Sequence, residues 1–145
     1  NIGGKQISNC TFYGAVVGTS YVAGITGSTD GYSGSYIGNC TNYGDIFSTG
    51  GKTGGIVGYA SSYTAYISNC INNGTIISTG DNVGGICGSY FWSVYNCTNN
   101  GNVTGNNNVG GICGYKNVPI GSSTNHGNIT GKNNRNISFQ LLNSI

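Results

Sequence analysis

Residues 67–88 read ISNCINNGTIISTGDNVGGICG, and two short motifs in this stretch return along the whole chain. The first has an aliphatic residue followed two places later by Asn-Cys. Its copies are ISNC at 7–10, IGNC at 37–40, ISNC at 67–70, VYNC at 94–97 and a degenerate IGSS at 120–123. The second is rich in glycine. Its copies are VAGITG at 22–27, TGGIVG at 53–58, VGGICG at 83–88 and VGGICG at 109–114. Ordered pairs of motifs at a fixed period are the signature of a repeat protein.

The spacing and chemistry of the motifs predict strands. The first motif recurs at steps of 30, 30, 27 and 26 residues, and its apolar segments are short, rich in Ile and Val, and bounded by Gly, Asn or Ser. Glycine every few residues would cost a helix about 1 kcal/mol each time. Each repeat offers three strand candidates: the Asn-Cys block, a Gly-x-Ile block and the Gly-Gly-Ile block. We therefore predict an all-β chain, a single domain over residues 1–145, folded as a parallel β-solenoid of about five triangular coils of 26–30 residues.

Stacked coils place equivalent residues in columns along the axis. An isoleucine column of the second motif should fill the interior; its members are Ile25, Ile56, Ile86 and Ile112. The first motif gives two further columns, one of Asn9, Asn39, Asn69 and Asn96 and one of Cys10, Cys40, Cys70 and Cys97. The asparagines can form an amide ladder or occupy a tight corner that Asn tolerates. The sequence leaves open which of Asn and Cys points inward.

The six cysteines allow two readings. Cys87 and Cys113 form a second column, and neighbouring rungs about 4.8 Å apart lie within the Cα separation that a disulfide permits. The alternative, which we favour, is that cysteine serves as a small buried residue, because Ser123 replaces it in the fifth copy. No pair has the short spacing of a zinc site.

Composition argues against several functional classes. Charged residues make up 6%, and the five basic residues are dispersed, so we expect no nucleic-acid partner. No apolar run reaches the roughly 18 residues of a membrane span. The carboxylates are Asp30, Asp45 and Asp81 in different registers, and His126 is the single histidine. We therefore expect no catalytic residues, no metal ligands and no cofactor, and hence no enzyme.

The paired motifs resemble the GLUG-motif repeat over roughly residues 7–131, with the best copies at 67–76 and 83–88. That resemblance implies a secreted or cell-surface location, as in bacterial adhesin-like proteins, and a non-catalytic structural or adhesive segment of a surface protein or filament. The chain starts at Asn1 and contains no Met, so we expect a segment or subunit of a larger assembly. The expected partners are neighbouring repeats or a second copy stacked end to end, with glycans or a host surface protein as further possibilities.

Aromatic residues after the Gly-Gly-Ile block suggest an alternative function. Five of them are candidate contacts with a ligand or partner: Tyr59, Tyr90, Phe91, Trp92 and Tyr115. Exposed Tyr and Trp suit stacking on sugar rings, which would make the chain a carbohydrate-binding module; otherwise these side chains cover the coil edge. Two expected threonine columns, one at 49, 79, 104 and 130 and one at 11, 41, 98 and 124, raise a weaker third alternative, an ice-binding solenoid.

Overall fold

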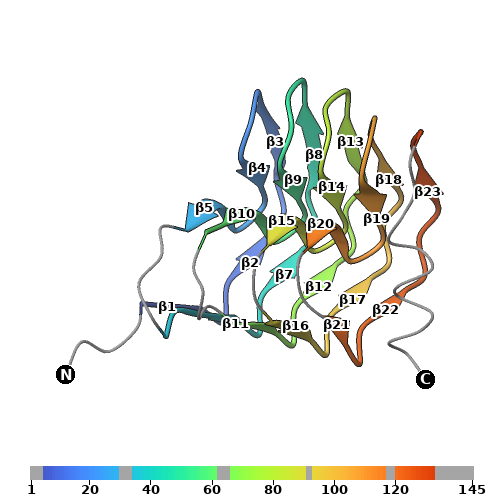
Figure 1. Cartoon of the computed structure of the whole chain (residues 1–145). Helices are drawn as coiled ribbons and strands as arrows, with labels where there is room; N and C mark the ends of the chain where they lie inside the picture. The colour runs from blue at the N-terminus through green and yellow to red at the C-terminus, as the bar shows by residue number, and fades with distance from the viewer. Residues whose placement is uncertain (1–4, 30–33, 62–65, 91–92, 117–119, 133–145) are drawn as a thin grey trace.

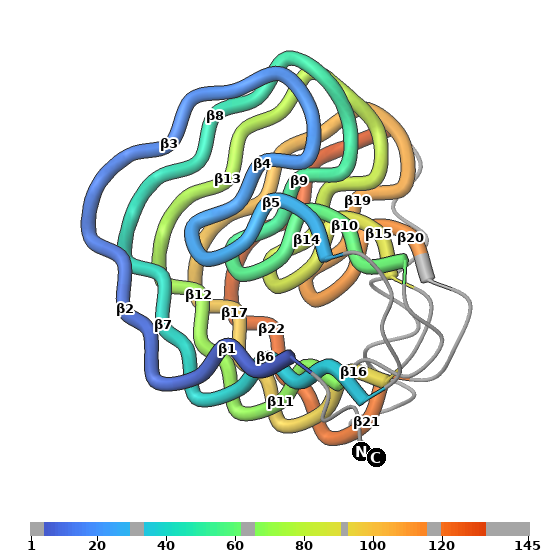
Figure 2. Tube along the Cα trace, turned by 90° about the vertical axis from the view of Figure 1, so that its left-hand side faces the viewer, coloured from blue at the N-terminus to red at the C-terminus, as the bar shows by residue number. Residues whose placement is uncertain are grey.

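The fold is a parallel β-solenoid of about four turns, as predicted from the repeat (Figure 1). The structure is a computed structural model that describes residues 5–29, 34–61, 66–90, 93–116 and 120–132. Every strand in these ranges pairs in parallel with the equivalent strand one coil away. In a view turned by 90° from that of Figure 1, successive coils follow one another around a common interior (Figure 2).

The strands form five sheets, one for each position around the coil. The first contains β1 (Gln6–Ser8), β6 (Tyr36–Gly38), β11 (Tyr66–Ser68), β16 (Ser93–Tyr95) and β21 (Ile120–Gly121). The second contains β2 (Thr11–Phe12), β7 (Thr41–Asn42), β12 (Ile71–Asn72), β17 (Thr98–Asn99) and β22 (Thr124–Asn125). The third contains β3 (Ala15–Gly18), β8 (Asp45–Ser48), β13 (Ile76–Ser78), β18 (Val103–Thr104) and β23 (Ile129–Thr130). The fourth contains β4 (Val22–Ala23), β9 (Thr53–Gly54), β14 (Val83–Gly84) and β19 (Val109–Gly110). The fifth contains β5 (Thr26–Thr29), β10 (Val57–Ala60), β15 (Cys87–Tyr90) and β20 (Cys113–Lys116).

A complete coil thus has five short strands where three were expected. The Asn-Cys block is divided because its asparagine has positive φ, between 52° and 58° in the four copies, which turns the chain between two strands. The Gly-Gly-Ile block is also divided, into a strand before and a strand after its isoleucine, although no residue within the block has positive φ. The fifth copy contributes three strands to the described residues, which accounts for the difference between the expected five coils and the observed four turns.

The interior consists of two apolar clusters. The larger contains the isoleucine column, the inward residues of the first sheet and the cysteines, and the smaller lies between the third and fourth sheets around Ile76 and Val83. Ile56, Ile86 and Ile112 are at most 1% exposed, which confirms the predicted core column, whereas Ile25 in the first coil is half-buried. Each coil therefore buries its apolar residues against the next, and the first described coil lacks one of these neighbours.

Candidate functional site

The Asn-Cys column has a definite orientation. Cys40, Cys70 and Cys97 are buried, while the preceding asparagines are exposed at the positive-φ corner. Cys10 is exposed because it belongs to the first coil. Asparagine at this corner follows from its tolerance of the left-handed region. The corner alternative for Asn9, Asn39, Asn69 and Asn96 is therefore the observed one, and cysteine is the inward residue.

The amide ladder is formed by different asparagines, two positions after each cysteine: Asn42, Asn72, Asn99 and Asn125. The Nδ2 atoms of Asn42, Asn72 and Asn99 each donate to the Oδ1 of the next asparagine at 2.7 Å. Each also donates to a glycine carbonyl in its own coil, at 2.9 Å for Asn72 and Gly74. We did not predict this ladder, although the sequence signal, Asn-Cys-x-Asn, was present in three exact copies. The ladder provides hydrogen-bond partners for side-chain amides that are buried in the interior.

All six cysteines are thiols in the structure, in line with the favoured reading. Cys87 lies opposite Cys113 in the paired strands β15 and β20. Burial raises the pKa of Cys40 to about 11, and burial also raises that of Cys87. The neighbouring Cys97 thiol and burial raise the pKa of Cys70. A raised pKa leaves little thiolate, which is the reactive form.

We expect the native chain to react with a thiol reagent at one cysteine. At pH 8 a thiol with a pKa of about 11 is only about one part in a thousand thiolate, and its burial adds a steric barrier. Iodoacetamide labelling followed by mass spectrometry should therefore modify Cys10 first and the five buried thiols only after denaturant is added. Raising the pH towards 11 should increase the thiolate fraction of Cys40. Rapid labelling of Cys87 or Cys113 in the native chain would contradict the buried column.

The predicted aromatic stripe is only partly exposed. Tyr90 is fully buried, so its prediction as a surface contact is wrong; its side chain packs in the larger cluster, where burial raises its pKa. Tyr59 is half-buried and Tyr115 is 40% exposed. Phe91 and Trp92 lie outside the described residues. The threonine column at 11, 41, 98 and 124 exists with Ile71 in its middle, whereas Thr104 aligns with Ile77, not with Thr79.

A second group of exposed apolar side chains lies on the outer surface of the second and third sheets. We call it the outer patch; its members are Tyr13, Val17, Tyr43, Phe47, Ile71 and Ile77. The Tyr13 and Tyr43 rings stack in parallel with centroids 4.9 Å apart, and Val17, Phe47 and Ile77 align across three paired strands. Exposed apolar patches of this kind mark contact surfaces. The predicted contact residues all follow the Gly-Gly-Ile block, so the sequence prediction did not include this patch.

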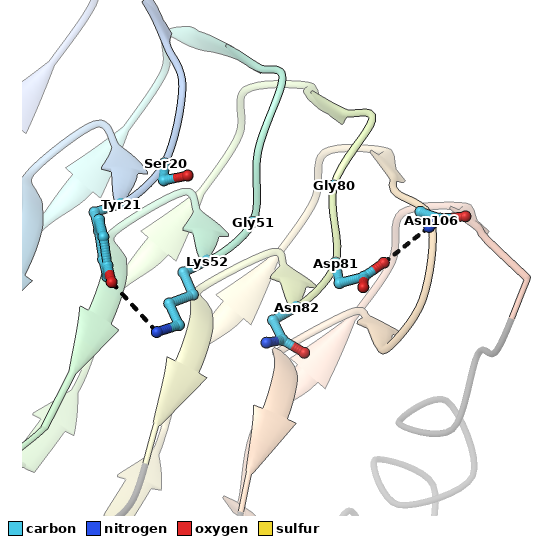
Figure 3. Close-up of a pocket in the computed structure, with 8 residues that line it drawn as sticks. All are labelled: Ser20, Tyr21, Gly51, Lys52, Gly80, Asp81, Asn82 and Asn106. Atoms are coloured by element: carbon cyan, nitrogen blue, oxygen red, sulfur yellow. Dashed lines mark hydrogen bonds between the residues drawn. The ribbon is translucent and has the colours of Figure 1, made fainter.

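A third candidate lies at the corner between the third and fourth sheets (Figure 3). We call it the corner hollow; it has a volume of about 380 Å³ and is lined by Ser20, Tyr21, Gly51, Lys52, Gly80, Asp81, Asn82 and Asn106. Tyr21, Lys52 and Asn82 occupy equivalent positions in successive coils, each with positive φ. The residues of the hollow thus come from four coils that the register brings together.

The corner hollow combines a cation, a carboxylate and an aromatic ring. The Lys52 ammonium lies 4.9 Å from the Tyr21 ring centroid and 4.4 Å from that of Tyr59, and it donates to the Tyr21 hydroxyl at 3.4 Å. Across the hollow, Asp81 Oδ1 accepts a hydrogen bond of 2.9 Å from Asn106 Nδ2. Asn107 donates two more to the same oxygen, at 3.0 and 3.1 Å. Convergent polar groups of this kind can orient a small polar ligand beside an aromatic ring.

Comparison with known proteins identifies no relative: no protein-family model, curated protein or solved structure matches the chain. In the described ranges, no group of three or more His, Cys, Asp or Glu side chains is placed to hold a metal ion. The same ranges contain no helix long and apolar enough to cross a membrane. The geometry of the repeat and of these surfaces is therefore the basis for inferring function.

Proposed function

We propose that the chain is a structural and adhesive segment of a secreted or cell-surface protein or filament, without catalytic activity. The observation that supports this most is that every described strand pairs through its backbone with the equivalent strand of an adjacent coil. Strands β1 to β5 have one strand neighbour each in the described part of the chain, so their other edges are available for a further coil. The resemblance to GLUG-motif repeats supports the same location and role.

The apolar interior also favours continuation at the first coil. Ile7 and Ile25 are half-buried, while their equivalents Ile37 and Ile56 are at most 1% exposed. Stacking another coil against this end would remove their remaining apolar surface from water, at about 25 cal/mol for each Å². The expected partner is a preceding repeat of a longer chain or a second copy of this one, and the outer patch offers a lateral contact for adhesion.

We expect Ile25→Lys to prevent end-to-end stacking. The lysine places a charge at the open end of the core, where a stacked coil would have to bury it. Size-exclusion chromatography and negative-stain electron microscopy of the parent chain at rising concentration should show growth along the axis, and the variant should stay monomeric.

Val17→Lys is the matched control, because Val17 belongs to the same coil but is 81% exposed on the outer patch. It should leave axial growth unchanged. If Val17→Lys stops assembly while Ile25→Lys does not, association is lateral. A parent chain that remains monomeric at every concentration would contradict self-stacking.

A second candidate function is carbohydrate binding, and the observation that favours it is the corner hollow. Its lining offers hydrogen-bond donors, acceptors and a partly exposed tyrosine ring, which together match the hydroxyls and the apolar face of a sugar. The described part of the predicted stripe, Tyr59, Tyr90 and Tyr115, is a less suitable platform, because Tyr90 is buried and Tyr59 already packs against Tyr21 and Lys52. Binding would therefore occur at the corner between the third and fourth sheets.

A further inference from the structure

The corner hollow contains residues that the solenoid itself does not require. The third and fourth coils have Asn82 and Asn108 at its positive-φ position, whereas the first and second coils have Tyr21 and Lys52, with φ of 58° and 63°. Asparagine adopts this region at low cost, but a tyrosine or lysine does so rarely. Backbone strain of this kind concentrates at ligand sites. The two unusual residues therefore indicate a role beyond turning the chain.

Lys52 presents a positive charge that the described residues do not neutralise. Its ammonium contacts the Tyr21 hydroxyl and the rings of Tyr21 and Tyr59, and none of these groups is a carboxylate. The two rings lie in a T-shaped arrangement with centroids 5.7 Å apart, which holds the ammonium at one side of the hollow. A fixed cation beside an open hollow favours an anionic group in the ligand.

The opposite side of the hollow suits hydroxyl groups. Asp81 is exposed, and its Oδ1 is held by Asn106 and Asn107, so the carboxylate is oriented before a ligand arrives. Asn82 accepts a bond of 2.8 Å from Asn108 at its Oδ1, which directs its Nδ2 away from that partner. Tyr21 is 45% exposed and adds apolar surface. A ligand that complements all three features has a carboxylate, several hydroxyls and an apolar face.

We propose that the corner hollow binds an acidic sugar, a uronic or sialic acid. The sugar carboxylate pairs with Lys52, its hydroxyls bond to Asp81 and Asn82, and its apolar face lies on the Tyr21 ring. This inference rests on carbohydrate binding as the function of the hollow, and it is independent of end-to-end stacking.

The test uses the full chain and two pairs of probes that differ in their acidic group: sialyllactose with lactose, and tri-galacturonate with its methyl ester. Titration calorimetry should give at least tenfold tighter binding for the acidic member of a pair, and added salt should reduce that preference. Lys52→Asn removes the cation and introduces the residue that the next two coils have at this position. We therefore expect it to fold with an unchanged or higher Tm, yet to lose acidic-sugar binding by at least tenfold. Lys52→Arg should retain most of it.

The outcomes distinguish failure of the acidic-sugar preference from failure of carbohydrate binding itself. Equal binding of the acidic and neutral probes, or unchanged binding by Lys52→Asn, would overturn the acidic-sugar inference while carbohydrate binding still stands. Displacement by acetate at the same concentration would show that the hollow binds a bare carboxylate, which also overturns it. If neither pair of probes binds the parent chain at millimolar concentration, both the inference and the carbohydrate candidate fail.

Discussion

Replacing Ile86 by aspartate is expected to abolish folding of the chain. Ile86 is fully buried in the third of the four coils, and its backbone bonds both neighbours, donating to Ile112 and accepting from Ile56. The substitution removes an apolar side chain and places a carboxylate where nothing can pair with it. The loss should exceed about 4 kcal/mol, which is comparable to the whole stability of many domains. Circular dichroism should show an unfolded chain at neutral pH.

Ile77→Asp is the matched control for this prediction. Ile77 belongs to the same coil and is the same residue type, but its side chain faces outward on β13 and is 43% exposed. We expect it to change the free energy of unfolding by less than about 1 kcal/mol. Similar losses for the two variants would mean that the assignment of inward and outward positions in the third coil is wrong.

The fold could be predicted because the same two motifs, with the same physical preferences, recur in each repeat. Short Ile-rich segments bounded by glycine cannot form helices, and the recurrence of one motif places Ile56, Ile86 and Ile112 in one column. The number of strands in a coil was less accessible, since it depends on where asparagine adopts positive φ within a motif. Positive φ is a backbone conformation, and the structure has it at Asn, Tyr, Lys, Ser and Gly, so residue type alone does not locate these turns.

The candidate sites were harder to predict than the fold. The corner hollow combines Tyr21, Lys52 and Asp81, which come from successive coils about 30 residues apart; Tyr21 and Lys52 immediately precede the second motif, and Asp81 lies two residues before it. The motif copies place these residues at one corner of the coil, but the motif does not indicate that their side chains line a hollow. Tyr90 shows the opposite difficulty: its place after the glycine motif suggested a loop, but β15 extends to it and directs its side chain inward.

Replacing Asn72 by alanine should destabilise the chain nearly as severely as a core substitution, although asparagine is polar. Asn72 Nδ2 donates to Gly74 and to Asn99, and its Oδ1 accepts from Asn42. The side chains of Asn42, Asn72 and Asn99 are fully buried, so the groups that lose Asn72 as a partner cannot bond to bulk water instead. Each unsatisfied group costs about 1–3 kcal/mol, and we expect a total loss of about 3–5 kcal/mol in urea unfolding.

Asn73→Ala is the control that shows whether the loss of stability comes from the buried ladder or from removing any side-chain amide. Asn73 is the next residue in the chain, and its side chain accepts one bond of 2.7 Å from the exposed Asn100. Its replacement should cost less than about 1 kcal/mol, because water can satisfy the partner that it leaves. Equal losses for Asn72→Ala and Asn73→Ala would contradict a structural role for the buried ladder.

The ladder should also show non-additivity that a set of independent hydrogen bonds would not. Once Asn72 is truncated, Asn99 has already lost the donor to its Oδ1, so truncating Asn99 as well removes a weaker set of interactions. The double variant Asn72→Ala with Asn99→Ala should therefore lose less stability than the sum of the two single variants, by about 1 kcal/mol or more. Strict additivity would mean that each asparagine acts within its own coil, and the continuous amide column would then have no energetic role in holding successive coils together.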